Sequence, residues 1–266
     1  MDLPVLGLLL IVAAVVLYGV ARANRRVALS VLGTEISSVE ELLALYALVA
    51  DQVGTGLFAQ RVGLQGTLEC DEPLQSELGN TPCAAFRYRV ERRWEEEYEE
   101  RDANGHRVRR TRSGRDAVAG NERRVPFWVH DATGRLPVIP DGARLEMERT
   151  VDRFEPGNRG GVVRFRGFEL RLNGAGGARR TLGYHFHEEV LPLGRPIYVL
   201  GNATDRAGSL AVGPHHELGE PFLVSLRTRE QVVHAARQIT DLARYAAYVC
   251  APLGMLLLII GILVHR

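Results

Sequence analysis

The sequence predicts a membrane-anchored, mainly β protein with flanking α-helices, in which an antiparallel β-rich domain lies between two transmembrane helices. Two uncharged apolar runs, at residues 3–20 and 245–264, and period-two alternation with turn residues over 61–226 support this prediction. The 266 residues are enough for one large domain or two small ones, with a core of ordinary size. We therefore expect a first span at 1–22, a juxtamembrane amphipathic helix and linker at 23–60, a β-rich domain at 61–228, and an amphipathic helix continuing into a second span at 229–266.

The composition excludes several functions. All 33 Lys+Arg residues are Arg, so the chain has no lysine for a Schiff base, for a P-loop or for accepting a ubiquitin group. These residues are balanced by 32 acidic ones, and the net charge of +1 gives no overall field that would recruit nucleic acid. Cys70, Cys83 and Cys250 contain no C-x-x-C pair, which argues against a zinc finger or a disulfide scaffold.

Each apolar run is long enough to cross about 30 Å of hydrocarbon as a helix. A cleaved signal peptide is the alternative for the first run, since Ala21-Arg22-Ala23 resembles a cleavage site. Asp2, at a position where a signal peptide carries a basic residue, and the length of the run favour an uncleaved anchor. Arg22, Arg25 and Arg26 follow the first run, and by the positive-inside rule they place the domain between the spans in the cytoplasm. We expect a two-pass protein of a prokaryotic cell membrane.

Two capping boxes predict helices beside the spans. Ser38 and Glu41 open an apolar helical pattern that Gly54 ends. Because this helix is apolar on most of its surface, it either lies against the bilayer or packs into the domain. Thr228 and Gln231 open a second helix that continues into the second span, where Pro252 should kink it.

The clearest strand pattern is at residues 86–98, where apolar and charged side chains alternate. Asn104-Gly105 is a preferred type I′ turn pair and predicts a hairpin rather than an arginine-rich nucleic-acid arm, because closing it there pairs opposite charges. The predicted pairs are Asp102–Arg107, Glu100–Arg109, Glu99–Arg110 and Glu97–Arg112.

Further strands are expected at 125–130, 145–151, 162–172, 182–190, 197–200 and 221–226. The apolar phase slips within 162–172, and Gly167 at the slip predicts a β-bulge.

Few residues have the pattern of a reactive site. His185, His187 and Glu189 share one face of a predicted strand, and the two histidines are candidate metal ligands. A solvated face is the favoured interpretation, since no third ligand has a supporting spacing, and we expect neither a metal nor a cofactor. Cys70 and Cys83 are interpreted as buried thiols rather than as a disulfide or nucleophiles, and we expect no catalytic residue.

A set of ordered motifs resembles a known family. The runs 66–74, 81–83 and 86–91, and later 140–143, 188–192, 198–201 and 221–225, together resemble the GIDE domain. This module, also called BAM ("beside a membrane"), occurs in Mulan-type mitochondrial E3 ubiquitin ligases and in bacterial and archaeal relatives. The motif residues, for which a structural role is the expectation, are Cys70, Pro73, Leu74, Ser76, Pro82, Cys83, Tyr88, Asp131, Gly134, Gly194, Gly201, Pro221 and Phe222.

The resemblance carries an expectation about function. Ligases of this family have a C-terminal RING finger with eight Cys/His zinc ligands, whereas this sequence ends two residues after its second apolar run, so we expect no RING finger. We therefore expect a non-catalytic interaction or sensing module whose partners are the lipid bilayer and either another protein or a second copy. The alternatives are an E3-ligase-like protein or ancillary subunit with a separate catalytic partner, and a metal-dependent membrane hydrolase using His185 and His187.

Overall fold

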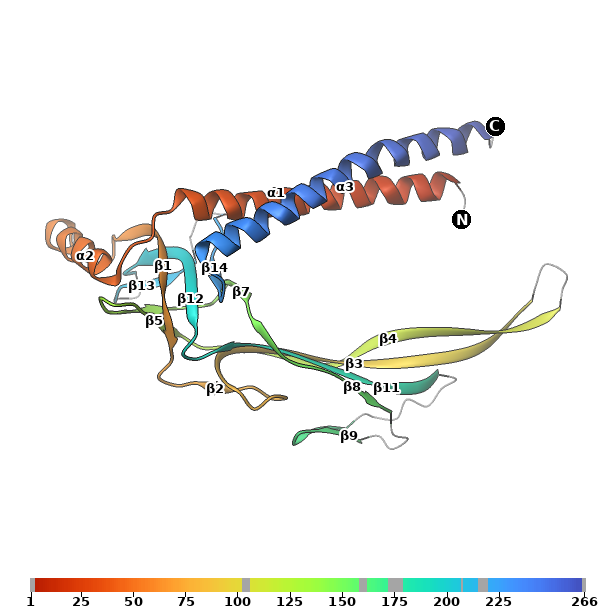
Figure 1. The fold of residues 1–266 in the computed structure, drawn as a ribbon, viewed down its shortest axis with the longest axis horizontal. Helices are drawn as coiled ribbons and strands as arrows, with labels where there is room; N and C mark the ends of the chain where they lie inside the picture. Colours follow the sequence, from red (N-terminus) through yellow and green to blue (C-terminus); the bar gives the residue numbers. More distant parts are fainter. Residues whose placement is uncertain are drawn as a thin grey trace.

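A β-rich body carries two long helices on one side (Figure 1). The computed structural model describes residues 3–101, 106–157, 162–171, 179–206, 208–214 and 220–264. Its helices are α1 (Leu3–Gly33), α2 (Val39–Val53) and α3 (Arg229–Val264). Its strands are β1 (Ala59–Glu69), β2 (Leu74–Gln75), β3 (Pro82–Arg101), β4 (Arg107–Arg124), β5 (Phe127–His130), β6 (Arg135–Val138), β7 (Arg144–Glu146), β8 (Glu148–Pro156), β9 (Val162–Phe165), β10 (Phe168–Arg171), β11 (Arg179–Pro192), β12 (Pro196–Thr204), β13 (Ala211–Gly213) and β14 (Leu223–Ser225). The mainly β class with flanking helices is confirmed.

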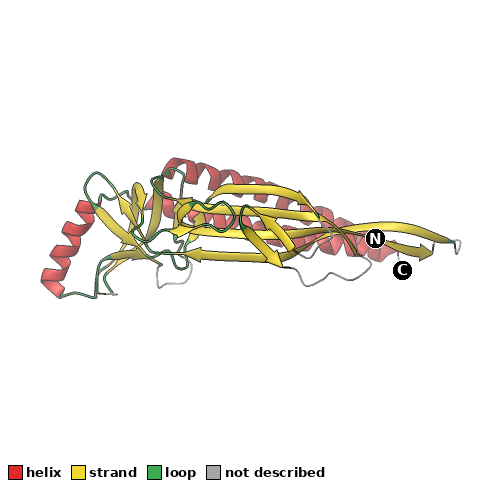
Figure 2. Cartoon of the chain, turned by 90° about the horizontal axis from the view of Figure 1, so that it is seen from below, coloured by secondary structure: helices red, strands yellow, loops and turns green. Residues whose placement is uncertain are grey.

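Two main sheets form the body. In the described part of the chain, one has seven strands in the order β1-β5-β6-β13-β12-β14-β7, and β1 also pairs with β12, so that β1, β5, β6, β13 and β12 close into a small barrel. The other places β8, β11, β3 and β4 side by side, with β2 also on β3, and its long strands extend away from the barrel (Figure 2).

Each layer has its own apolar core. The barrel encloses the largest cluster, and Val39 and Leu42 of α2 are part of it. One face of the long sheet packs under the β2 segment and the β9–β10 hairpin, where Phe165 stacks on Phe186 with ring centroids 4.7 Å apart. The bases of α1 and α3 pack on the seven-stranded sheet through Val31, Val232 and Val233. The second sheet therefore has one apolar face and one polar face.

The helices α1 and α3 pack antiparallel through small residues. A Cβ built at Gly254 would lie 2.8 Å from the carbonyl oxygen of Gly7, so the two backbones touch. The small residues recur every seven positions on both helices, which keeps one narrow seam against the partner helix. The seam consists of Gly7, Ala14, Ala21 and Ala28 on α1 and Thr240, Ala247, Gly254 and Gly261 on α3, all of them buried.

Both helices are long and apolar enough to cross a membrane. At its base, α1 ends against Arg229, whose guanidinium donates to the carbonyl oxygens of Val31, Leu32 and Thr34 at 3.1–3.2 Å. A cation at this position satisfies carbonyl groups that the end of a helix leaves unpaired. The start of α3 is thereby fixed to the end of α1.

Both predicted capping boxes are confirmed. The Ser38 hydroxyl accepts from Glu41 N and the Glu41 carboxylate accepts from Ser38 N, and Thr228 and Gln231 make the equivalent pair of bonds before α3. Helix α2 ends at Gly54 as expected and packs one side into the barrel core, while Leu43 and Leu48 on its other side are exposed. Pro252 lies inside α3.

The β3–β4 hairpin pairs its own charges, but its predicted register was wrong by one residue. Glu99 lies opposite Arg109 and not Arg110, and the ion pairs Arg107–Glu99, Arg109–Glu97, Arg110–Glu100 and Arg112–Glu96 are cross-strand. The prediction counted from the turn alone, whereas packing sets the register: the Trp94 indole lies over Gly114, where no side chain fits. Asn104-Gly105 lies outside the described residues.

Two other strand predictions need correction. The bulge expected at Gly167 is a two-residue turn between β9 and β10, since Arg166 and Gly167 both have positive φ, 44° and 92°, as a type I′ turn requires. The single strand expected at 145–151 is divided between β7 and β8, which belong to different sheets. The strands expected at 125–130, 182–190, 197–200 and 221–226 are present.

Candidate functional site

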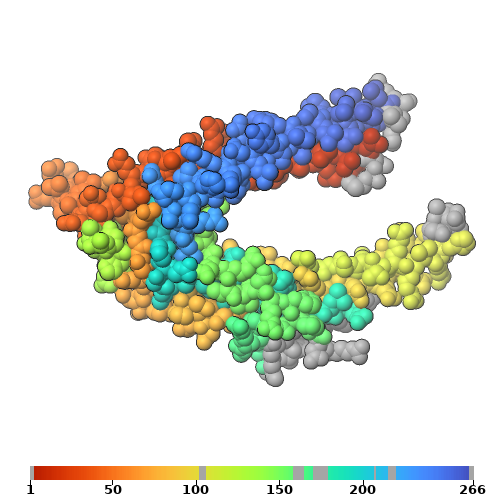
Figure 3. All heavy atoms as spheres, viewed as in Figure 1, coloured from red at the N-terminus to blue at the C-terminus, as the bar shows by residue number. Residues whose placement is uncertain are grey.

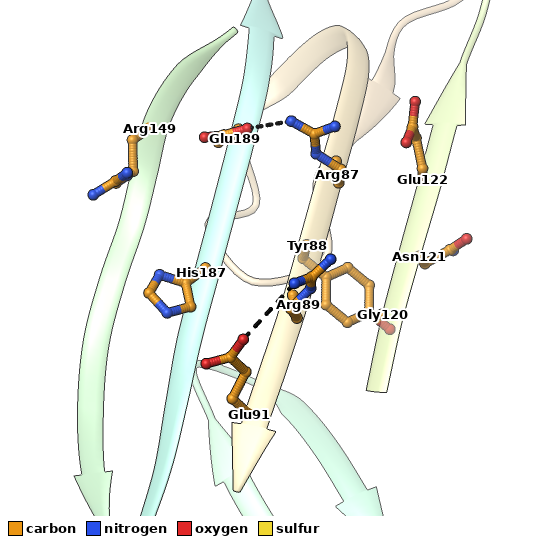
Figure 4. Close-up of a pocket in the computed structure, with 10 residues that line it drawn as sticks. All are labelled: Arg87, Tyr88, Arg89, Glu91, Gly120, Asn121, Glu122, Arg149, His187 and Glu189. Carbon is orange, nitrogen blue, oxygen red and sulfur yellow. Dashed lines mark hydrogen bonds and ion pairs between the residues drawn. The ribbon is translucent and has the colours of Figure 1, made fainter. Parts of the chain in front are cut away.

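The polar face of the long sheet forms one wall of a broad hollow beneath the helix pair (Figure 3). A cavity of 340 Å³ where the two parts meet is lined by Arg87 and Glu189 from the sheet and by Asn24, Val27 and Ala236 from the helices. Farther along the strands, Arg89, Glu91 and His187 continue this face by alternation. They line a second cavity, of 610 Å³, which Figure 4 shows.

This polar face, which we call the concave face, neutralises itself. Arg87 donates to Glu189 at 2.7 Å, and Arg89 Nη1 lies 3.8 Å from Glu91 Oε1 (Figure 4). Exposed pairs of this kind contribute little to stability, and they leave no excess of positive charge for phosphate groups. A surface with both signs interleaved suits a partner of mixed charge, such as a protein.

Strands β8 and β11 bring together Asp152, His185 and His187. Asp152 lies opposite His187 in the register, and His185 is two residues away on the same face. The Asp152 Oδ1 atom is 2.7 Å from His185 Nε2 and 3.2 Å from His187 Nδ1, and the two imidazole rings are 3.9 Å apart. These three side chains form a group able to hold a metal ion.

Neighbouring groups set the charge of this cluster. The hydrogen bond with His185, and then that from Arg149, lowers the pKa of Asp152. Burial and then the nearby His185 lower the pKa of His187, which favours its neutral form. Arg93 Nη2 lies 3.2 Å from His185 Nδ1 and completes the hydrogen bonding of that ring.

The sequence placed both histidines on one face correctly but missed Asp152. The expectation that no third ligand accompanies them is corrected, because Asp152 reaches them across the β8–β11 pairing from 33 residues away in the chain. Only the pairing of two strands reveals this neighbour. The predicted strand at 145–151 also ended one residue before it.

Glu188, next to His187, points to the other side of the sheet and is fully buried. Its carboxyl group accepts hydrogen bonds from Leu78 N at 2.7 Å, Gly79 N at 2.8 Å, Ser76 Oγ at 2.9 Å and Thr150 Oγ1 at 3.1 Å. It therefore fixes the loop between β2 and β3 onto β11. Ser76, a motif residue, holds this loop through its hydrogen bond to Glu188, and it belongs to no reaction centre among the described residues.

Asp131 has a similar role at the other end of the body. Its Oδ2 accepts from Val39 N at 2.9 Å, and its Oδ1 accepts from the backbone N–H groups of Thr133 and Gly134. The carboxylate thus caps both a turn and the first turn of α2. Burial opposes the ionisation of Asp131, but these hydrogen bonds outweigh it and lower its pKa.

We expect Asp131→Ala to lower the free energy of unfolding by about 1–2 kcal/mol, as loss of a helix cap does. Because the folded pKa is lowered, this stabilisation is complete above the ordinary aspartate pKa of about 3.9 and disappears as pH falls through the folded value. Urea unfolding of the two proteins across this range measures the difference. Asp141→Ala, at an exposed turn, is the control, and an equal loss there would contradict the capping role.

The remaining motif residues lie in turns and core contacts. Gly201 is inside the barrel, where a Cβ would lie 2.8 Å from Val212 Cγ1, and Gly194 has a φ of 69° in the turn before β12. Gly134 faces Val39 of α2. The others are distributed as follows: Leu74 pairs with Cys83 and Pro82 with Gln75, Tyr88 and Phe222 are buried, and Pro73 and Pro221 precede β2 and β14.

Cys70 and Cys83 are free thiols. Cys83 is fully buried, and burial, then Glu188, raises its pKa to about 11, whereas Cys70 is half-buried with a pKa that burial also raises. We expect a maleimide at neutral pH to label Cys70 slowly and Cys83 only after unfolding, because the thiolate reacts. Mass spectrometry of labelled peptides measures both sites, and rapid labelling of Cys83 in the folded chain would contradict its burial.

The fold and its motifs define a class of protein: a β-rich domain flanked by two long apolar helices, in which the motif carboxylates fix backbone segments. The GIDE family model, described as E3 ubiquitin ligase, matches residues 95–260, more than half of the chain, and the chain belongs to this family. The E3 ubiquitin-protein ligase SPL1 of Arabidopsis thaliana is 26% identical over 142 residues, which are 50% of this chain and 38% of that protein. No solved structure matches.

Proposed function

We propose that the chain is a two-pass membrane protein whose GIDE domain is a membrane-proximal interaction or sensing module without catalysis of its own. The concave face is its contact surface, and a protein of mixed charge is its partner. One observation carries this proposal. The apolar helix pair, which is suited to lipid, lies beside a polar sheet face that lines a hollow (Figure 3).

The helix pair supports membrane anchoring. Its small residues face each other, and its large apolar side chains face outward, which is the arrangement that lipid favours and water does not. The packing of Ala21 and Ala28 against α3 also favours a retained anchor over a cleaved signal peptide. Outward-facing residues include Leu8, Val12, Val15 and Val16 on α1 and Leu253, Leu256, Ile259 and Leu263 on α3.

Membrane fractionation tests the anchor. We expect the full chain to resist extraction with alkaline carbonate and to keep residues 1–23 in its mature form. Arg22, Arg25 and Arg26 support a cytoplasmic domain by the positive-inside rule, so protease added to sealed cells should spare the domain. Recovery of the chain in the soluble fraction, or cleavage after Ala23, would contradict the anchor.

Site-specific crosslinking tests the contact surface. A photoreactive amino acid in place of Arg89, on the concave face, should crosslink to one partner reproducibly in native membranes. The same group in place of the exposed Gln75 on β2 is the matched control and should not. Equal crosslinking from both positions, or from neither, would contradict a specific partner at the concave face.

Membership in a family described as E3 ubiquitin ligase favours a second function, that of an ancillary subunit for a separate ligase. The match covers 38% of SPL1, so the activity in that protein's name is a proposal here. In this case the protein crosslinked at Arg89 carries a RING finger, and its ubiquitin transfer in a reconstituted assay increases when this chain is added. The chain alone with E1 and E2 enzymes should form no conjugates.

A further inference from the structure

We propose that Asp152, His185 and His187 form a binding site for one divalent late first-row transition-metal ion, with Zn²⁺ as the representative. The ligands are one carboxylate oxygen and two imidazole nitrogens, a set that such ions accept. His187 also lines the concave face, but metal binding by these three residues does not require the proposed interaction function.

The distances support a shared ion. The three ligand atoms lie within 4.8 Å of one another, and Asp152 Oδ1 is the common neighbour of both imidazoles. Zinc ligands at about 2.0–2.2 Å from the ion lie about 3.3 Å apart in a tetrahedral arrangement. The 3.2 Å between Asp152 Oδ1 and His187 Nδ1 matches this spacing, and the 2.7 Å to His185 Nε2 has to widen only slightly.

The fold holds these ligands in place while leaving them accessible. All three side chains stand on two adjacent, hydrogen-bonded strands, which fixes their relative height. Arg149 binds Oδ2 of Asp152 at 2.7 Å, so Oδ1 remains directed at the histidines. The side chains are 17–38% exposed, which gives an ion a path from solvent while most of each side chain is enclosed.

One neighbour has to move. A metal on His185 Nε2 leaves Nδ1 as an N–H donor, and the guanidinium of Arg93, 3.2 Å away, is not an acceptor. Glu91 stands opposite His185 in the β3–β11 register and offers the carboxylate that usually accepts this proton beside a metal site. Metal binding therefore replaces Arg93 by Glu91 as the hydrogen-bond partner of His185 Nδ1.

Metal titration of the full chain in detergent, after treatment with EDTA, tests the site. Each chain should bind one Co²⁺ ion, which gives a visible absorption band, and Zn²⁺ should displace this Co²⁺. Asp152→Asn and His187→Ala should each weaken Co²⁺ binding at least about tenfold, a typical effect of damage to a metal site. Glu91→Gln should weaken binding, and Arg93→Gln, which replaces a donor by a possible acceptor, should tighten it.

His130→Ala is the matched control. His130 likewise lies beside a carboxylate, with Nδ1 2.7 Å from Glu69 Oε1, but it is more exposed and has no second imidazole next to it among the described residues. Its replacement should leave Co²⁺ binding unchanged. No saturable Co²⁺ binding by the wild type, or equal binding by wild type, Asp152→Asn and His187→Ala, would overturn the proposal. Asp152→Asn keeps the size of the side chain, so unchanged thermal unfolding separates lost binding from lost folding.

Discussion

Replacing Glu188 by alanine is expected to lower the free energy of unfolding by about 3–5 kcal/mol, because the buried donors that it serves lose their acceptor. Leu78 N and Gly79 N belong to the loop between β2 and β3, which covers the apolar face of the long sheet. In the variant these two N–H groups are buried without an acceptor, which lowers the free energy of unfolding. Urea unfolding followed by tryptophan fluorescence measures it.

Glu189→Ala is the natural control for this prediction. It removes the adjacent carboxylate, which faces the concave side and pairs with Arg87 at a partly exposed position. Removing an exposed ion pair costs about 0.2–1 kcal/mol. Losses of similar size for Glu188→Ala and Glu189→Ala would show that the loop does not depend on the buried carboxyl group.

A leucine at Gly254 is expected to separate α1 from α3. The Cβ alone would lie 2.8 Å from the carbonyl oxygen of Gly7 and 3.0 Å from atoms of Leu10 and Ile11, so the helix backbones have to move apart. Because the seam is continuous, the effect extends along the pair. We expect disulfide formation between cysteines introduced at Ala14 and Ala247 to slow at least about tenfold, because overpacking at Gly254 moves the two helices apart.

Gly19 provides the matched control on the same helix pair. A Cβ at Gly19 would meet nothing within 4 Å, so Gly19→Leu adds the same side chain on the outer surface of α1. Crosslinking between positions 14 and 247 should then remain fast. The fluorescence of Trp94 and Trp128 in the β-rich body reports whether either variant disturbs the domain. Equal crosslinking in both leucine variants would contradict close packing at Gly254.

Local patterns in the sequence predicted much of the fold. Capping boxes and strand alternation depend on neighbouring residues, and Ser38, Thr228 and the 86–98 strand could be placed for that reason. The hairpin register depends instead on how Trp94 packs on Gly114, which turn propensity does not contain. The seven-residue spacing of Gly7, Ala14, Ala21 and Ala28 was a readable signal for the helix seam, and it was missed.

The candidate site was predictable only in part. His185 and His187 share a face because alternate residues in a strand always do. Asp152 joins them, and Glu188 meets Ser76, only through pairings between distant strands. The structural role expected for the family motif residues stays a prediction, and the contacts of Asp131 and Glu188 with backbone N–H groups show how two of the motif segments are held in place.

In the two-pass arrangement proposed above, the charged hairpin limits how the molecule sits in a bilayer. Residues 97–101 and 106–113 are exposed and rich in Arg and Glu, and they extend in the same direction as the apolar ends of α1 and α3 (Figure 1). Each such charge costs about 2.5–3.5 kcal/mol at the centre of a membrane, so lipid around the helices must exclude the hairpin.

An upright helix pair therefore has to lean away from the sheet. Asn24 and Thr240 mark where this bend is easiest, since their side chains bond to the carbonyl oxygens of Val20 and Ala236 one turn earlier, a contact that bends helices. Lipid insertion would then increase the separation between the helix pair and the long sheet.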